Sequence, residues 1–217
     1  MRVLRNAGII DAMSTMYPAR LHVIAGTRNF DEHAVTLYGA VVSGRARVRG
    51  PGIDAELDAG GFFGMPGPCV VVPDGEVMVV ERLGHRAVPT LGRIEERGRL
   101  VYIDGCSDTI LCSPARLGDP VLNHLHFPPG TEQSVHIHPS TRLGVVMRGR
   151  GVAFGPGWEE PLVPGVAFLL NEHERHAFRT SDESMDVIAF HPDSDWGPTD
   201  AAHPMLNRTY VCKPKGD

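Results

Sequence analysis

From Leu21 onwards, the chain alternates short apolar runs with glycine, proline and aspartate. Its first half contains the runs LHVIAG, AVTLYGAVVSG, FFGMPG, CVVVPDG and EVMVVERLG. Short β-type runs separated by turn residues are typical of an all-β barrel or sandwich, and not of a helical or βαβ fold. Residues 1–20 lack this pattern, and we expect them to form a short helix or a lead-in that ends at Pro18.

The chain repeats itself at an offset of 105 positions, so that position 36 falls on position 141. At this offset TLYGAVVSGRA coincides with TRLGVVMRGRG, Gly60 with Gly165, and His33 with His138. Chance agreement between common turn residues is the alternative explanation. Identical spacing over the whole span favours a duplicated β unit. The identities in the first segment are Thr36, Gly39, Val41, Gly44 and Arg45 against Thr141, Gly144, Val146, Gly149 and Arg150.

The repeat predicts two domains. We expect the first at residues 1–90, with the short lead-in, and the second at residues 118–217. Residues 91–117 would be a connector with one plausible strand at positions 100–103. The tail after His191 is rich in proline and aspartate, and we expect it to be ordered coil that wraps the second unit.

The second half of the chain also holds most of the histidines. Eight of the eleven histidines lie after residue 120, and His136 and His138 form an H-x-H pair. On a strand, alternate residues share one face and lie about 7 Å apart along the chain. The expected strand would therefore bring the two imidazoles close enough to share one metal ion.

Several glycines, one proline and a third histidine lie at characteristic distances from this pair in the sequence. The full set is Gly130, His136, His138, Gly149, Pro164, Gly165 and His176. In type and spacing it resembles the two sequence motifs of the cupin superfamily, and the resemblance covers both halves of the chain. It implies an all-β bicupin, that is, two tandem jelly-roll β-barrels. It also implies that His136, His138 and His176 bind one divalent metal ion.

The departures from the family's pattern affect the expected chemistry. Four residues after His138, where the motif has Glu, the chain has Arg142; Asn171 and Thr180 replace the usual Pro and Asn around the third His. A guanidinium has no free lone pair and cannot ligate a metal. Three neutral imidazoles leave coordination positions open and the charge of the ion uncompensated. If Arg142 points inward, as the family's Glu does, its guanidinium suits a carboxylate or phosphate, and we expect an acidic small substrate that bridges the metal and Arg142.

The corresponding positions of the first unit have lost the ligand pattern. They are Asp31, His33, Leu37 and Val71. Apolar residues at the last two positions fill a barrel with side chains instead of ligands. We therefore interpret the first unit as a degenerate, structural cupin.

A second H-x-H pair, His124 and His126, alternates with Leu125 and Phe127. Either the histidines or the apolar residues face the inside of the barrel, and apolar residues usually take the inside. His126 lies nearer the turn, and we keep it as a second catalytic candidate that would either support a metal ligand or shuttle a proton.

Three further histidines are weaker candidates. His173 occupies a turn and is expected to be exposed, and His191 and His203 are expected to be structural or surface residues. The tail could still close over the barrel mouth and supply a base, because histidine titrates near neutral pH.

Composition and charge exclude some classes of function. The net charge of −5 and the pI of about 6.1 argue against nucleic acid as a partner, because phosphate binding needs a basic face. No apolar run approaches the ~18–20 residues of a membrane span. The N-terminus has no apolar signal region, and the four cysteines lack C-x-x-C spacing. We expect a cytoplasmic protein with reduced thiols.

The resemblance implies a metalloenzyme that acts on a small, anionic organic substrate. For a three-His cupin it implies Fe(II) dioxygenation first. Non-redox Zn(II) chemistry by a lyase, isomerase, cyclase or rearrangement enzyme is the alternative, and a metabolite-binding cupin without turnover is another. Imidazole suits iron, zinc, copper and nickel alike, so the sequence leaves the metal open.

The second unit also presents apolar residues on its expected outer face. They are Val135, Ile137, Leu143, Val145 and Met147. This face favours a homodimer, although packing of the two units against each other could use the same surface.

Overall fold

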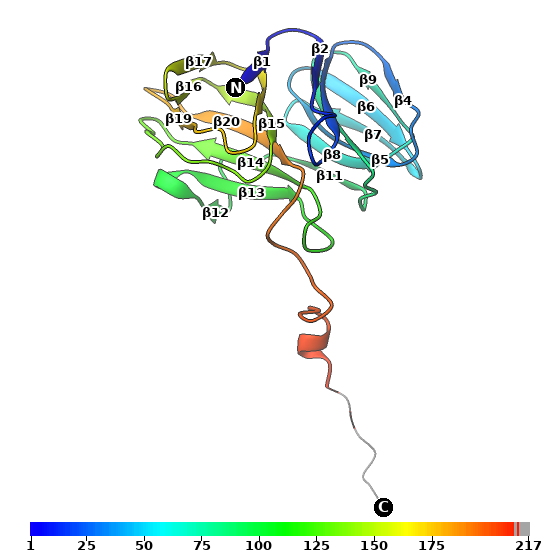
Figure 1. Cartoon of the computed structure of the whole chain (residues 1–217). Helices are drawn as coiled ribbons and strands as arrows, with labels where there is room; N and C mark the ends of the chain where they lie inside the picture. Colours follow the sequence, from blue (N-terminus) through cyan, green and yellow to red (C-terminus); the bar gives the residue numbers. More distant parts are fainter. Residues whose placement is uncertain (211, 213–217) are drawn as a thin grey trace, which may run out of the picture.

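The computed structural model describes residues 1–210 and residue 212 (Figure 1). These residues form twenty strands and two short 3-10 helices, η1 (Ile103–Gly105) and η2 (Leu206–Arg208). Two β units lie side by side, and each consists of one large and one small sheet. The expected all-β fold class is confirmed. The described part of the chain contains no helix with the length and apolarity that a membrane crossing requires.

The N-terminal unit has a six-stranded and a four-stranded sheet. In spatial order the large sheet contains β11 (Thr90–Arg93), β8 (Gly61–Pro66), β5 (Val35–Val41), β10 (Val77–Leu83), β3 (Ala19–Ile24) and β2 (Gly8–Asp11). The small sheet contains β4 (Arg28–Phe30), β9 (Cys69–Pro73), β6 (Arg45–Gly50) and β7 (Ile53–Asp58).

The C-terminal unit has a seven-stranded and a three-stranded sheet. The large sheet contains β1 (Arg2–Leu4), β18 (Ala167–Leu170), β15 (Arg142–Gly149), β20 (Met185–His191), β14 (Val121–Phe127), β13 (Ser107–Cys112) and β12 (Leu100–Val101). The small sheet contains β17 (Trp158–Leu162), β16 (Gly151–Gly155) and β19 (Ala177–Arg179). The order β8-β5-β10-β3 in one unit corresponds to β18-β15-β20-β14 in the other.

One close packing contact recurs in both units at the offset of 105 positions. Gly39 pairs with Phe63 between β5 and β8, and Gly144 pairs with Phe168 between β15 and β18. A Cβ on Gly39 would lie 2.2 Å from the Phe63 ring, and one on Gly144 would lie 2.6 Å from the Phe168 ring. Each glycine therefore makes room for a phenylalanine ring that lies across its strand. This shared packing supports the duplication predicted from the sequence.

The ends of the units differ from the sequence-based prediction. Residues 1–20 form strands β1 and β2 and no helix. β1 joins the large sheet of the C-terminal unit, whereas β2 joins that of the N-terminal unit. The predicted connector, residues 91–117, contributes β11 to the first unit, and β12 and β13 to the second. Strand pairing with distant partners, which local patterns do not reveal, accounts for these differences.

Three hydrophobic clusters form the core. One fills the inside of the N-terminal unit and another the inside of the C-terminal unit. The third lies between the units and combines residues such as Leu21 and Tyr38 with Leu143, Val145 and Met147. The apolar outer face of β15 is therefore covered by the other unit of the same chain. Val135 and Ile137 remain 43% and 52% exposed.

The tail packs on the C-terminal unit only at its beginning. The backbone N–H groups of Leu117 and Gly118 donate to the carbonyls of Pro198 and Ser194. Beyond this point the described part of the tail extends away from both units (Figure 1). The expected wrapping of the second unit is therefore limited to the first residues after His191.

Candidate metal centre and its cavity

His136, His138 and His176 come together at one end of the C-terminal barrel. The backbone N–H of His136 donates to the carbonyl of His176 (2.9 Å), and the reverse hydrogen bond is 3.0 Å long. The segment with the H-x-H pair pairs with β19 and its neighbours through isolated bridges, and is not the regular strand predicted from the sequence. Alternation still holds, because the intervening Ile137 is exposed while both imidazoles line the cavity.

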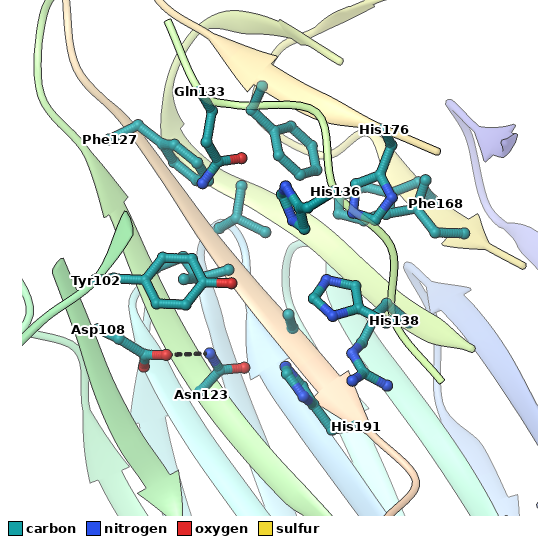
Figure 2. Close-up of a pocket in the computed structure, with 16 residues that line it drawn as sticks. Tyr102, Asp108, Asn123, Phe127, Gln133, His136, His138, Phe168, His176 and His191 are labelled. Carbon is teal, nitrogen blue, oxygen red and sulfur yellow. Dashed lines mark hydrogen bonds between the residues drawn. The ribbon is translucent and has the colours of Figure 1, made fainter. Parts of the chain in front are cut away.

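The three imidazoles converge on one point (Figure 2). Their ring centroids are 5.0 Å apart for His136 and His138, 4.5 Å for His136 and His176, and 5.1 Å for His138 and His176. One ligand nitrogen of each residue lies within 4.8 Å of the others. Within the described residues this is the one such group of three or more, and no carboxylate belongs to it.

Backbone carbonyls determine which nitrogen of two of these rings is free. His136 Nδ1 donates to the carbonyl of Ser134, and His176 Nδ1 donates to the carbonyl of Glu174, each at 2.8 Å. Because a carbonyl only accepts, Nδ1 carries the proton and Nε2 keeps its lone pair. The Nε2 of His176 is buried and has no hydrogen-bond partner. This unpartnered nitrogen fits a metal ligand, and the residues present are therefore suited to a divalent ion.

Burial keeps two of the three imidazoles, those of His138 and His176, neutral. Burial, together with the Arg142 guanidinium, lowers the pKa of His138 to about 3. Burial also lowers the pKa of His176 to about 4. At neutral pH both rings are therefore in the form that binds metals.

Arg142 points into the barrel, which is the orientation that the resemblance to the family's Glu position implied. It is the first residue of β15 and is 8% exposed. Its Nη1 donates to the Ser140 hydroxyl (2.6 Å) and to the carbonyls of Ser140 (3.1 Å) and Thr141 (3.2 Å), whereas its Nε is buried without a partner. In the described part of the chain, no carboxylate lies within 4.0 Å of this guanidinium. Arg142 is therefore a buried cation without a directly bonded anion.

Two adjoining cavities meet at Arg142. The inner cavity, of about 50 Å³, is lined by the three histidines and by apolar residues such as Phe127, Phe168 and Phe178. The outer cavity, of about 250 Å³, is lined by residues that include Val121, Pro139, Asp193 and Asp195. Four residues line both cavities and form the wall that they share: Asp108, Asn123, Arg142 and His191.

Several cavity residues were missed by the sequence-based prediction. His191 was expected to be a structural or surface residue, yet its ring centroid lies 6.2 Å from that of His138. Alternation along β20 would have placed it inside, because Val187 and Ala189 on the same face line the cavity. Burial and the Arg142 charge lower the pKa of His191 well below its usual value. The other residues that were missed are Tyr102, Asp108, Asn123 and Gln133 (Figure 2).

The structure does not bring His126 to this cavity. Leu125 and Phe127 face the inside of the barrel, as alternation favoured. His124 Nε2 and His126 Nδ1 both bond Asp186 Oδ1, at 2.7 Å and 2.9 Å, on the opposite face of β14. The two histidines project from the side of the sheet that faces away from the cavity. Their side chains therefore cannot reach the candidate metal ligands. A proton-shuttle role for His126 is therefore not supported.

Two other candidates also lie outside the cavity. His173 is exposed, with a positive φ of 57°, and its Nδ1 lies 3.7 Å from a carboxylate oxygen of Glu172. His203 is exposed in the tail. Neither residue lines the inner or the outer cavity.

The N-terminal barrel has no comparable group of ligands among the residues that the structure describes. Leu37 and Val71, at the positions of Arg142 and His176, are fully buried in its core. Asp31 and His33 are exposed. The interpretation of this barrel as filled by apolar side chains agrees with these positions.

Comparison with solved structures identifies the fold. The chain resembles the cupin 2 conserved barrel domain protein from Leptotrichia buccalis, at 14% identity and a TM-score of 0.62, over 87% of this chain and 88% of that one. The protein has the cupin fold. No protein-family model and no curated protein matches the sequence.

Two other cupin-fold structures are similar to the chain. Ylba from E. coli shares 16% identity and a TM-score of 0.60, over 89% of this chain and 84% of that one. A mutant of salicylate 1,2-dioxygenase from Pseudoaminobacter salicylatoxidans, solved in complex with gentisate, shares 12% identity and a TM-score of 0.61, over 81% of this chain and 68% of that one. Identities this low establish the cupin fold and not the reaction.

Proposed function

We propose that this cupin is a metal-dependent enzyme that acts on a small anionic organic substrate, and that its reaction is an Fe(II)-dependent dioxygenation. One observation carries the proposal. Three imidazoles converge without a carboxylate ligand, and the buried, unpaired guanidinium of Arg142 lines the same cavity. This combination suits a metal with open positions beside a site for an anion.

His136, His138 and His176 would hold the ion. When bound, a ferrous ion would supply redox chemistry toward O₂ and Lewis acidity toward the substrate. The carbonyls of Ser134 and Glu174 keep two of these imidazoles in the tautomer with a free Nε2. The site is therefore preorganised for the ion before it binds.

The wall of the cavity would bind and orient the substrate. Arg142 is fixed by Ser140 and Thr141, so its Nε is held in place for an anionic group. The inner cavity is lined by phenylalanine and leucine side chains, which exclude water from the reacting atoms. The solved complex of salicylate 1,2-dioxygenase with gentisate agrees with a small acidic substrate.

Metal analysis combined with oxygen uptake tests this proposal. The protein is purified without added metal, its metal content is measured, and oxygen consumption is followed with a panel of small carboxylic acids after anaerobic Fe(II) loading. Iron at one equivalent with acid-dependent oxygen uptake supports the proposal. Zinc without oxygen uptake would contradict dioxygenation and favour non-redox lyase, isomerase, cyclase or rearrangement chemistry. Metal binding with ligand binding but no turnover of any acid would contradict an enzyme and favour a metabolite-binding protein.

A further inference from the structure

The wall between the two cavities contains three polar atoms that lack a hydrogen-bond partner. They are Nε of Arg142, Oδ1 of Asn123 and Oδ1 of Asp108, and all three are buried. The side chains belong to β15, β14 and β13, and each lines both cavities. Buried polar atoms without partners are costly to a fold, and several in one wall indicate a bound ligand that satisfies them.

Asp108 and Asn123 present acceptors and not donors to the cavity. The Asn123 Nδ2 donates to Asp108 Oδ2 at 2.7 Å, which fixes the orientation of the amide. The amide oxygen consequently lies on the side away from Asp108, toward the cavity (Figure 2). Asn123 is only 3% exposed, so water is largely excluded from this oxygen. A ligand group beside the pair must therefore donate hydrogen bonds.

The charges around the pair favour a cationic donor. Asp108 forms no ion pair within 4.0 Å in the described part of the chain. Burial raises its pKa to about 6, although the Asn123 amide acts in the opposite direction. The outer cavity adds the carboxylates of Asp193 and Asp195, and Arg142 is the permanent cation of its described lining. An ammonium group would compensate this excess of negative charge.

We infer that Asp108 and Asn123 form an ammonium-binding subsite, and that the substrate is a zwitterion whose carboxylate binds Arg142. Hydrogen bonds from the ammonium would reach Asp108 Oδ1 and Asn123 Oδ1, and the carboxylate would reach Arg142 Nε. This inference rests on the proposed function and specifies the chemical class of its substrate.

The cavity volumes limit how such a molecule lies. An apolar cavity of about 150 Å³ holds a benzene ring, and the inner cavity of about 50 Å³ is much smaller. The outer cavity of about 250 Å³ has room for the body of a small amino acid. The two charged groups then lie at the shared wall, and only the part that reacts enters the inner cavity.

Binding of matched acids to the zinc-loaded protein tests the subsite. The probes are glycine, β-alanine and 4-aminobutyrate, each compared by calorimetry with the unsubstituted acid and the hydroxy acid of the same length. For at least one chain length, the amino acid should bind about tenfold tighter than the unsubstituted acid and the hydroxy acid. The reason is that hydrogen bonds between charged groups are stronger than those between neutral groups. In Asp108→Asn this ratio should fall below about threefold, and Asn123→Ala should reduce it independently. Asp182→Asn, which removes an exposed carboxylate outside both cavities, should keep the wild-type ratio.

The outcomes separate the subsite from the proposed function. Equal binding of amino, hydroxy and unsubstituted acids would overturn the ammonium subsite and leave the anionic site at Arg142 intact. A preference for the hydroxy acid would overturn it as well, because it would show a neutral donor at Asp108. The subsite would also be overturned if Asp108→Asn and Asn123→Ala, with folding verified by circular dichroism, both kept the preference for the amino acid. If no acid of any class binds, the proposed function fails and this inference fails with it.

Discussion

His136 and His176 exchange both of their backbone hydrogen bonds, although forty positions separate them in the chain. This bridge sets the distance between the two imidazoles, whose centroids lie 4.5 Å apart. The same two residues each donate from Nδ1 to a nearby backbone carbonyl. Backbone geometry therefore fixes both the separation and the tautomer of these two imidazoles in the candidate metal centre.

Removal of one imidazole should abolish metal binding. For His136→Ala and His176→Ala we expect the affinity for Zn(II) or Fe(II) to fall by about a hundredfold or more, since loss of outer-shell support alone costs about 10–100-fold. The measurement is metal content after dialysis against a competing chelator. His173→Ala removes an exposed histidine outside the cavity and should keep the metal. Full occupancy in His176→Ala would show that the ligand set is wrong.

Replacement of Arg142 should affect anion binding more than metal binding. Arg142→Leu removes the buried guanidinium, and the affinity for a small carboxylate should fall by about 1.5–3 kcal/mol, the range for hydrogen bonds to charged groups. Arg142→Lys keeps the positive charge but lacks the paired N–H donors of the guanidinium, and it should retain part of the affinity. Calorimetry with the zinc-loaded variants measures both effects. Unchanged carboxylate affinity in Arg142→Leu would exclude this residue as the anion site.

The close contact between Gly144 and Phe168 should make a single methyl group destabilising. In Gly144→Ala the new Cβ would lie 2.6 Å from the ring, and overpacking of this kind costs about 1–3 kcal/mol. Gly39→Ala should behave in the same way against Phe63. Urea denaturation measures both, with Gly26→Ala as the control because nothing lies within 4 Å of its Cβ position. Wild-type stability of both variants would refute the shared packing.

Asp108 should make the stability of the protein depend on pH. Its pKa is raised to about 6 by burial, against about 3.8 for the unperturbed group. Between these values the folded state binds more protons than the unfolded state, so this group reduces stability as the pH rises. The penalty is complete above pH ~6 and disappears below pH ~4. Asp108→Asn should therefore gain stability over the wild type across this window, by about 1–3 kcal/mol, because one pKa unit corresponds to about 1.36 kcal/mol.

Denaturation curves of the wild type and Asp108→Asn between about pH 4 and pH 8 measure this difference. Other groups interact with the carboxyl, notably His124 and the Asn123 amide, and both are retained in the variant. The subtraction therefore isolates the contribution of Asp108. A difference that is constant with pH would show that Asp108 keeps its ordinary pKa.

Asp186 should be important for the fold and not for the metal. It is buried and accepts hydrogen bonds from His124, His126 and Arg148. Asp186→Ala leaves these groups without their anionic partner, and breaking a buried charged network costs about 3–5 kcal/mol. Chemical denaturation of Asp186→Ala should show this loss of stability. His126→Ala, in contrast, should leave metal content and carboxylate affinity unchanged. Lower turnover in His126→Ala, with metal content and carboxylate affinity unchanged, would restore the proton-shuttle hypothesis.

Much of the fold could be predicted from the sequence because it follows from local patterns. Turn residues between short apolar runs indicate strands, and the repeat indicates two equivalent units. Alternation favoured Leu125 and Phe127 inside the barrel, and both line the inner cavity. Residue type and spacing also brought His136, His138 and His176 into one group.

The sequence by itself determined the strand pattern, the duplication and the three imidazoles, since each depends on residue type and on spacing along the chain. Only the tertiary structure decided how distant segments combine. It placed β1 in the sheet of the other unit, and β13 beside β14, so that Asp108 meets Asn123. It also covered the outer face of β15 with the N-terminal unit. Such contacts are set by burial and strand pairing between positions far apart in sequence, which no local pattern records.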